Sequence, residues 1–184
     1  PGVIAKMGFG YDELKKLKPD IIMTNVSGFG QYGPYRDRPA FDTVGQAMCG
    51  LMTVTGFPDT PPTRAGFSIV DRVTALHATI GTLAALFHRQ LTGEGQTVDV
   101  CLLDGAYTLT EIPISNYLLT GRVPKRQGNG GGMPPSNTYL AKDGYVYITG
   151  ATRTIWKRFS QAIGRPDFAE KYTDREKRAE AAAE

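Results

Sequence analysis

The spacing of apolar residues along the chain predicts one long helix over residues 69–91. The members of its apolar face recur every three or four residues: Val73, Leu76, Ile80, Leu83 and Phe87. A second face carries mostly short side chains: Asp71, Thr74, Ala75, Ala78, Thr82 and Ala85. Short side chains let a neighbouring element approach closely, so this second face suits tight packing.

The segments around this helix alternate between strand and helix patterns. Residues 11–19 are typical of a helix ended by a proline, and residues 20–30 form an apolar run of strand length that ends in glycines. A second helix is predicted over 41–56 and a loop over 57–66. Residues 96–119 begin as a short strand and continue as a helix. This order predicts an α/β domain with a mostly parallel sheet.

The C-terminal third has a different character. Residues 120–136 are rich in glycine, proline and cations, lack periodicity and indicate a domain boundary. Residues 137–150 alternate aromatic and β-branched side chains around Asp143 and Gly144, which predicts a β-hairpin. Two helical segments are expected in the residues that follow.

Composition narrows the function classes. A formal net charge of +3 does not suggest a nucleic-acid binder and suits a small anionic ligand. Cys49 and Cys101 lack the spacing of a metal or redox pair, so free thiols in a cytoplasmic protein are expected. We expect no membrane contact, because no apolar run is predicted to reach membrane-spanning length and no secretory signal pattern is found. The missing initial Met and the charged, uncapped end indicate a fragment.

Common fingerprints of catalytic sites are mostly absent. The sequence has no GxxxxGK[ST], GxSxG or HExxH motif. Gly28, Gly30 and Gly33 fit the dinucleotide pattern GxGxxG, but Pro34 follows in place of a small-residue helix. The pattern is therefore a weak indication of dinucleotide binding.

Asp71, at the start of the long helix, has two interpretations. Ser68 and Asp71 form an S-x-x-D sequence close to a capping box, with Ser68 as N-cap and Asp71 at the third helical position. The same place suits a nucleophile, because free backbone N–H groups and the helix dipole would keep the carboxylate ionised and stabilise negative charge during attack. A carboxylate can attack an activated acyl group and form an anhydride.

Five segments are informative together and in this order: "PGVIAKMGFGYDELKKLKPDII", "SGFGQYGPYRDRPAFDTVGQAMCGLMTVTG", "PPTRAGFSIVD", "GTLAALFHRQLTGEGQTVDVCLLDGA" and "GGGMPPSNTYLAKDGYVYI". They resemble the class III CoA-transferase family, which includes formyl-CoA transferase, carnitine CoA-transferase and, as a divergent branch, α-methylacyl-CoA racemase. The resemblance implies an open, Rossmann-like sheet domain and the start of a smaller α+β domain. On it, residues 1–125 belong to the large CoA-binding domain, 126–136 form a glycine-rich linker, and 137–184 begin the small domain.

The resemblance also implies a mechanism without a metal or a permanently bound cofactor. Asp71 stands at the position of the family's nucleophile. In the family this aspartate attacks an acyl-CoA thioester and gives an aspartyl-acyl anhydride and free CoA thiolate. The thiolate returns to form an aspartyl-CoA thioester, from which an acceptor carboxylic acid takes the CoA.

Further site residues follow from the same resemblance. Lys6 falls where some members have a basic residue that contacts CoA, and Met7 suits an apolar contact to adenine. A segment that lines the CoA site near the thiol matches Ala40, Phe41 and Asp42. A glycine-rich loop that covers the active site in some members matches Gly130, Gly131 and Gly132. A surface lysine, a core methionine and a plain linker are equally compatible with these patterns.

Two alternatives to transfer stay open. The racemase branch has a histidine at the position of Phe41, and a phenyl ring cannot exchange protons, which favours transfer. A catalytically inactive CoA-binding fragment is the other alternative, since the family's N-terminal part and much of its C-terminal part are missing. The resemblance implies an interlocked homodimer for the intact protein. The sequence does not identify the acyl donor or the acceptor acid.

Overall fold

The computed structural model of the chain describes residues 1–130, 132, 134–150 and 152–180. These residues form two compact units. Unit 1 comprises Pro1–Thr55 and Pro62–Lys125, and unit 2 comprises Gly56–Pro61 and Arg126–Glu184.

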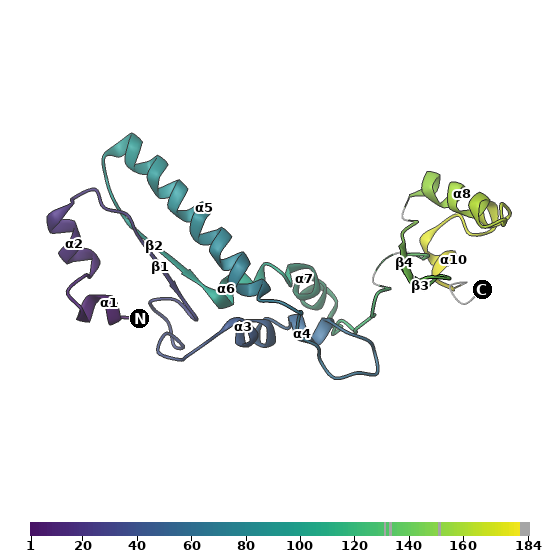
Figure 1. Cartoon of the computed structure of the whole chain (residues 1–184), viewed down its shortest axis with the longest axis horizontal. Helices are drawn as coiled ribbons and strands as arrows, with labels where there is room; N and C mark the ends of the chain where they lie inside the picture. Colours follow the sequence, from purple (N-terminus) through teal and green to yellow (C-terminus); the bar gives the residue numbers. More distant parts are fainter. Residues whose placement is uncertain (131, 133, 151, 181–184) are drawn as a thin grey trace. The chain divides into compact units, whose positions relative to one another are not determined.

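Unit 1 holds two strands and seven helices among its described residues, shown in purple to green in Figure 1. In chain order they are α1 (Val3–Lys6), α2 (Tyr11–Leu17), β1 (Met23–Ser27), α3 (Asp42–Met48), α4 (Leu51–Val54), α5 (Ile69–Thr92), β2 (Thr97–Cys101), α6 (Leu102–Tyr107) and α7 (Glu111–Thr120). Unit 2 holds β3 (Asn137–Leu140), β4 (Tyr145–Ile148), α8 (Arg153–Ala162), α9 (Phe168–Lys171) and α10 (Arg175–Glu180).

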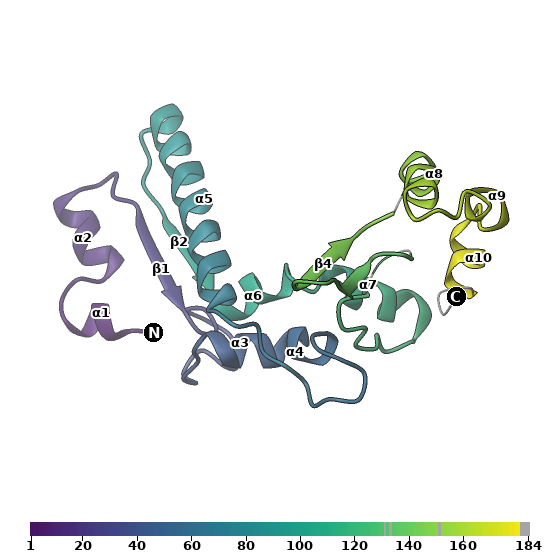
Figure 2. The ribbon, with the colours of Figure 1, turned by 45° about the vertical axis from the view of Figure 1, so that its right-hand side comes forward.

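The two strands of unit 1 run parallel, with Met23 opposite Thr97 and Ser27 opposite Cys101. Helix α5 lies on one side of the strands, and α1 and α2 lie on the other, as Figures 1 and 2 both show. A parallel pair needs a long crossover connection, which α3, α4 and α5 provide between β1 and β2. The predicted α/β fold with a parallel sheet is confirmed.

Helix α5 packs on the sheet and on α6 through its short side chains. The hydroxyl oxygens of Thr24 on β1 and Thr82 on α5 lie 2.6 Å apart. Thr74 is buried against Gly105 of α6, where a Cβ atom on the glycine would come within 2.5 Å of the Thr74 hydroxyl oxygen. The close approach predicted for this face is confirmed.

The large apolar face of α5 is uncovered among the described residues. Four of its five predicted members are more than half exposed: Leu76, Ile80, Leu83 and Phe87. By length and composition, Ile69–Thr92 is also the one described helix able to cross a membrane, so the expectation that no apolar run is long enough is wrong. One such helix is weak support for a membrane span, because core helices of water-soluble proteins meet the same criterion. The absence of membrane contact stays a prediction.

Several predicted helix boundaries need correction. The segment 41–56 forms two short helices, because Gly50 takes a left-handed conformation with a φ of 82° between α3 and α4. The helix expected before residue 119 is interrupted between α6 and α7. The first residues form α1, a single turn that no periodicity could have indicated.

Unit 2 contains the predicted hairpin, in which Asn137 pairs with Ile148 and Leu140 with Tyr145. Its helices pack around Trp156, whose ring stacks on Phe159 and Phe168 and whose Nε1 donates a hydrogen bond to the Phe168 carbonyl at 3.1 Å. The buried Arg178 guanidinium lies 4.5 Å from the centre of the Trp156 ring. The hairpin prediction is confirmed.

Candidate active site

Asp71 is the third residue of α5, as the sequence predicted, and its side chain is exposed. Among the residues that the structure describes, its carboxylate makes no hydrogen bond or ion pair. Both carboxylate oxygens are therefore available to a ligand or a substrate.

The predicted capping box is not formed. Ser68 does occupy the N-cap position of α5, but its side chain makes no capping hydrogen bond. The cap comes instead from Asp42, the first residue of α3. Its Oδ1 accepts hydrogen bonds from the backbone N–H of Val70 at 2.7 Å and of Asp71 at 3.3 Å. A carboxylate that lies 28 residues away in the chain replaces the local serine.

Three of the backbone donors at the start of α5 are occupied. Asp42 takes the N–H groups of Val70 and Asp71, and the N–H of Ile69 donates to the Phe67 carbonyl at 2.9 Å. These are three of the four N–H groups that a helix start normally leaves unpaired. The expectation that free N–H groups here would stabilise charge during attack is therefore wrong, because the protein itself uses them.

Gln46 completes the network one turn further along α3. Its Nε2 donates to Asp42 Oδ2 at 2.5 Å and to the Phe67 carbonyl at 3.5 Å, and its Oε1 accepts from the Ala65 N–H at 2.8 Å. The Gln46 side chain is 0% exposed and Asp42 is 7% exposed. Two residues of α3 thus bind the backbone on both sides of Ser68.

An apolar contact holds α3 against α5 at the same level. Val70 is fully buried in a cluster with Cys49 and Ala106. A Cβ atom on Gly45 would lie 2.9 Å from Val70 Cγ1, so only a glycine allows the helices to approach this closely. The network of Asp42 and Gln46 is therefore supported by tight packing beneath it.

The predicted CoA segment divides into three environments. Ala40 packs on Gly28, at the end of β1, where a Cβ atom on the glycine would meet the Ala40 side chain. The Phe41 ring is 77% exposed directly beside the buried Asp42. Asp42 uses both carboxylate oxygens inside unit 1. CoA contacts by these residues stay predictions, and the observed bonds give Asp42 a second role.

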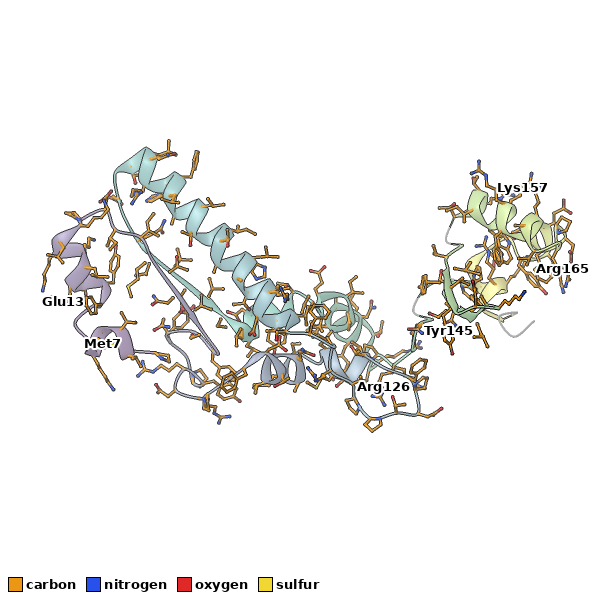
Figure 3. The ribbon with its side chains drawn as sticks, in the orientation of Figure 1. Met7, Glu13, Arg126, Tyr145, Lys157 and Arg165 are labelled. Atoms are coloured by element: carbon orange, nitrogen blue, oxygen red, sulfur yellow. The ribbon has the colours of Figure 1, made fainter. Side chains whose placement is uncertain are left out.

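Lys6 and Met7 lie at the end of α1, and both are exposed. The side chain of Met7 is labelled in Figure 3. Next to them, a hollow of about 530 Å³ opens between the preceding residues of α1 and the strands, with Ser27, Thr97 and Asp99 on the strand side. The structure does not bring Lys6 or Met7 into contact with the Asp71 network. Their role in CoA binding stays a prediction.

The predicted glycine loop belongs to unit 2. Gly130 and Gly132 line a cavity of about 360 Å³ together with Trp156, Phe159 and Arg178. Gly131 lies outside the described residues. Asp71 belongs to unit 1, so a covering role for this loop over Asp71 stays a prediction.

Sequence reasoning missed Gln46 and the capping role of Asp42. A signal was present, since residues four apart on a helix lie on one face, and an Asp and a Gln so spaced can pair. Nothing in the sequence next to this pair indicated its hydrogen bonds with residues 65, 67, 70 and 71. Among the described residues, no three His, Cys, Asp or Glu side chains are grouped as a metal site would need.

Comparison with known proteins gives the family. Residues 1–184 match the sequence profile described as CoA-transferase family III. The chain is 46% identical over 171 residues to succinyl-CoA–D-citramalate CoA-transferase of Chloroflexus aurantiacus, covering 92% of this chain and 42% of that protein. It is 39% identical over 171 residues to acetyl-CoA:oxalate CoA-transferase of Acetobacter aceti, covering 92% of this chain and 44% of that protein. The chain thus spans less than half the length of these relatives.

A solved structure agrees with this assignment. The fold is similar to that of a CAIB/BAIF family protein from Brucella suis, with a TM-score of 0.84, 33% sequence identity, and coverage of 99% of this chain and 49% of that chain. The resemblance drawn from the sequence is confirmed. The chain belongs to CoA-transferase family III.

Proposed function

We propose that the intact protein transfers coenzyme A from an acyl-CoA thioester to a carboxylic acid, with Asp71 as the nucleophile. The observation that carries the proposal is the exposed Asp71 carboxylate, which makes no hydrogen bond or ion pair among the described residues of a CoA-transferase family III chain. An unpaired carboxylate keeps its lone pairs free for attack, whereas a carboxylate held in a salt bridge would have to break it first.

The proposed chemistry balances without any further reactant. An Asp71 oxygen attacks the thioester carbon, the carbon–sulfur bond breaks, and CoA leaves as a thiolate. The thiolate attacks the Asp71 carbonyl of the resulting anhydride and releases the donor acid as a carboxylate. The acceptor carboxylate then attacks the carbonyl carbon of the aspartyl-CoA thioester, the carbon–sulfur bond breaks, and a new anhydride and the CoA thiolate are formed. A last attack by the thiolate on the acceptor's acyl carbon gives the new acyl-CoA and restores the Asp71 carboxylate.

The acceptor we propose is a short dicarboxylic acid. Both relatives named above carry such acids in their names, D-citramalate in one and oxalate in the other. The mild positive net charge of +3 is compatible with an anionic acceptor and an anionic CoA ester. Binding of CoA by Lys6, Met7 and residues 40–42 belongs to the same proposal, as does closure of the 130–132 loop.

The test is CoA exchange by the intact protein, measured for a panel of CoA esters and short dicarboxylic acids. We expect new CoA esters to form in the wild type and their formation to stop in Asp71→Ala and Asp71→Asn, with folding checked by circular dichroism. Full activity of Asp71→Asn would refute the proposal.

Two other outcomes would assign another function. Deuterium incorporation at the α-carbon of a 2-methylacyl-CoA without CoA transfer would identify a racemase, despite the phenyl ring of Phe41. Binding of CoA without exchange for any acid would identify a binding protein. We further propose an interlocked homodimer for the intact protein, and light scattering that gives a monomer would contradict it.

A further inference from the structure

We infer that Asp42 and Gln46 are positioning residues for Asp71, so that α3 fixes the backbone from which the nucleophile projects. This inference rests on the proposed function, since it assigns their purpose through Asp71. It differs from the expected CoA contact, in which Asp42 would face the ligand.

The Asp42 carboxylate binds the backbone of the nucleophile directly. Its Oδ1 accepts from the N–H groups of Val70 and of Asp71 itself, at 2.7 and 3.3 Å. One bond therefore begins on the backbone nitrogen of the nucleophile. A charged acceptor forms stronger hydrogen bonds than a serine hydroxyl would, and burial strengthens them further.

Gln46 in turn holds Asp42 in place. Its carboxamide binds Asp42 Oδ2, the Phe67 carbonyl and the Ala65 N–H, and it is completely buried. The segment before the helix and the first turn of the helix are thereby tied to the same turn of α3. Neither segment can shift without breaking one of these bonds.

Apart from the buried Val70, the side chains at the start of α5 supply no other tether among the described residues. The N-cap residue Ser68 contributes no capping bond through its side chain, and the Asp71 carboxylate has no partner there. Asp71 is thus held through its backbone and through the packing of its neighbour Val70, and not through its own side chain. Because a displacement of about 1 Å can cost on the order of 100-fold in rate, the bonds from α3 are expected to affect turnover directly.

Exchanging the carboxylate of Asp42 and the amide of Gln46 between the two positions tests the inference. In Asp42→Asn, the new amide can still accept from Val70 and Asp71, but its NH₂ faces the NH₂ of Gln46. If Gln46 turns over, its NH₂ faces the Ala65 N–H instead. In Gln46→Glu, two carboxylates face each other. The double variant Asp42→Asn/Gln46→Glu restores the bond between the two side chains, since the introduced amide donates to the introduced carboxylate, which still accepts from Ala65. It loses the 3.5 Å bond from residue 46 to the Phe67 carbonyl.

The experiment measures kcat and KM for the acyl-CoA in the intact protein carrying each single variant and the double variant. We expect each single variant to lower kcat by about 10- to 100-fold with little change in KM, and the double variant to recover most of kcat. The control is Thr110→Val, which removes another buried hydrogen bond of unit 1, from Thr110 Oγ1 to the Cys49 carbonyl at 3.0 Å. It should lower stability while kcat stays within about 2-fold.

Hydrogen exchange of the backbone amides of Val70 and Asp71 gives a second, activity-independent readout. We expect protection to fall in Asp42→Asn and to return in the double variant. Unchanged protection in Asp42→Asn would overturn the inference. So would a rise in KM that the double variant does not reverse, which would identify a CoA contact, or an equal loss of kcat in Thr110→Val. A wild type without CoA exchange would refute the proposed function alone, because amide protection still tests the positioning.

Discussion

The contact between Gly105 and Thr74 gives a sharp test of how closely α6 packs on α5. Gly105 is buried in α6, and a Cβ atom added to it would lie 2.5 Å from Thr74 Oγ1 and 3.4 Å from Thr74 Cα. Thr74 cannot easily turn away, since it is 1% exposed and its hydroxyl donates to the Val70 carbonyl at 2.7 Å. We therefore expect Gly105→Ala to destabilise the protein.

The expected change in the free energy of unfolding combines two losses and one gain. Overpacking a well-filled site costs about 1–3 kcal/mol. Rotation of Thr74 out of the way would forfeit a hydrogen bond that contributes about 1 kcal/mol. Replacing a helical glycine by alanine stabilises the helix by about 1 kcal/mol. The sum is a net loss of about 1–3 kcal/mol in the free energy of unfolding, because overpacking and the lost hydrogen bond together outweigh the gain in helix propensity.

Urea unfolding of the intact protein measures this loss, with Thr74→Ala as the matched background. Removing the hydroxyl and methyl groups of Thr74 makes room for the new Cβ atom. In that background Gly105→Ala is therefore expected to be neutral or stabilising by up to about 1 kcal/mol, through helix propensity alone. A single variant Gly105→Ala as stable as the wild type would refute the close packing of α5 on α6. Equal losses in both backgrounds would show that the two residues are not in contact.

Three further predictions concern other parts of the chain. The Thr82 hydroxyl donates to the Ala78 carbonyl at 2.7 Å, so the Thr24 hydroxyl must donate to Thr82. Thr82→Val leaves the Thr24 donor without its acceptor and should therefore lower the free energy of unfolding in urea by about 1 kcal/mol more than Thr24→Val does. Equal losses would contradict this donor assignment. The Arg126 guanidinium binds the Phe57 and Thr60 carbonyls at 3.1 and 2.6 Å, so Arg126→Ala should speed limited proteolysis within residues 56–61, and an unchanged cleavage rate would contradict it. Burial raises the pKa of the Cys101 thiol and so lowers its thiolate fraction at about pH 8. A thiol reagent should therefore modify Cys101 far more slowly in the folded than in the unfolded protein, and equal rates would refute its burial.

Local patterns in the sequence were sufficient for the elements that carry strong periodicity. The helix predicted over 69–91 is observed as Ile69–Thr92 and ends at Gly93, whose φ of 76° suits a glycine. The hairpin was predicted from alternation around the Asp143–Gly144 turn. Short elements such as α1, with four residues, are too brief for any period to be read.

The candidate site was predicted only in part, for a physical reason. The position of Asp71 on its helix follows from local spacing. The same local spacing led to the incorrect capping role of Ser68, because Ser68 is the nearest suitable side chain. The observed cap, Asp42, competes from 28 residues away. Such a contact is set by the packing of Gly45 on Val70, and nothing in the neighbouring sequence indicates that two helices approach there.

The exposed face of α5 makes the same point about packing. Its periodicity predicted an apolar face, and the face is present, but its four large residues are uncovered in this chain. Periodicity shows which side chains share a face and says nothing of what lies against it. The short-residue face, which is less apolar, is the one that packs on the sheet and on α6.

The central claim is that Asp71 becomes covalently bound to CoA, and one measurement tests it most directly. The intact protein is incubated with the acyl-CoA that supports exchange, without an acceptor acid, then quenched in acid and analysed by peptide mass spectrometry. We predict a CoA thioester on Asp71 that disappears when the acceptor is added, is converted to a hydroxamate by hydroxylamine, and is absent in Asp71→Asn. A CoA adduct on another residue, or CoA exchange that persists in Asp71→Asn without any adduct, would contradict it.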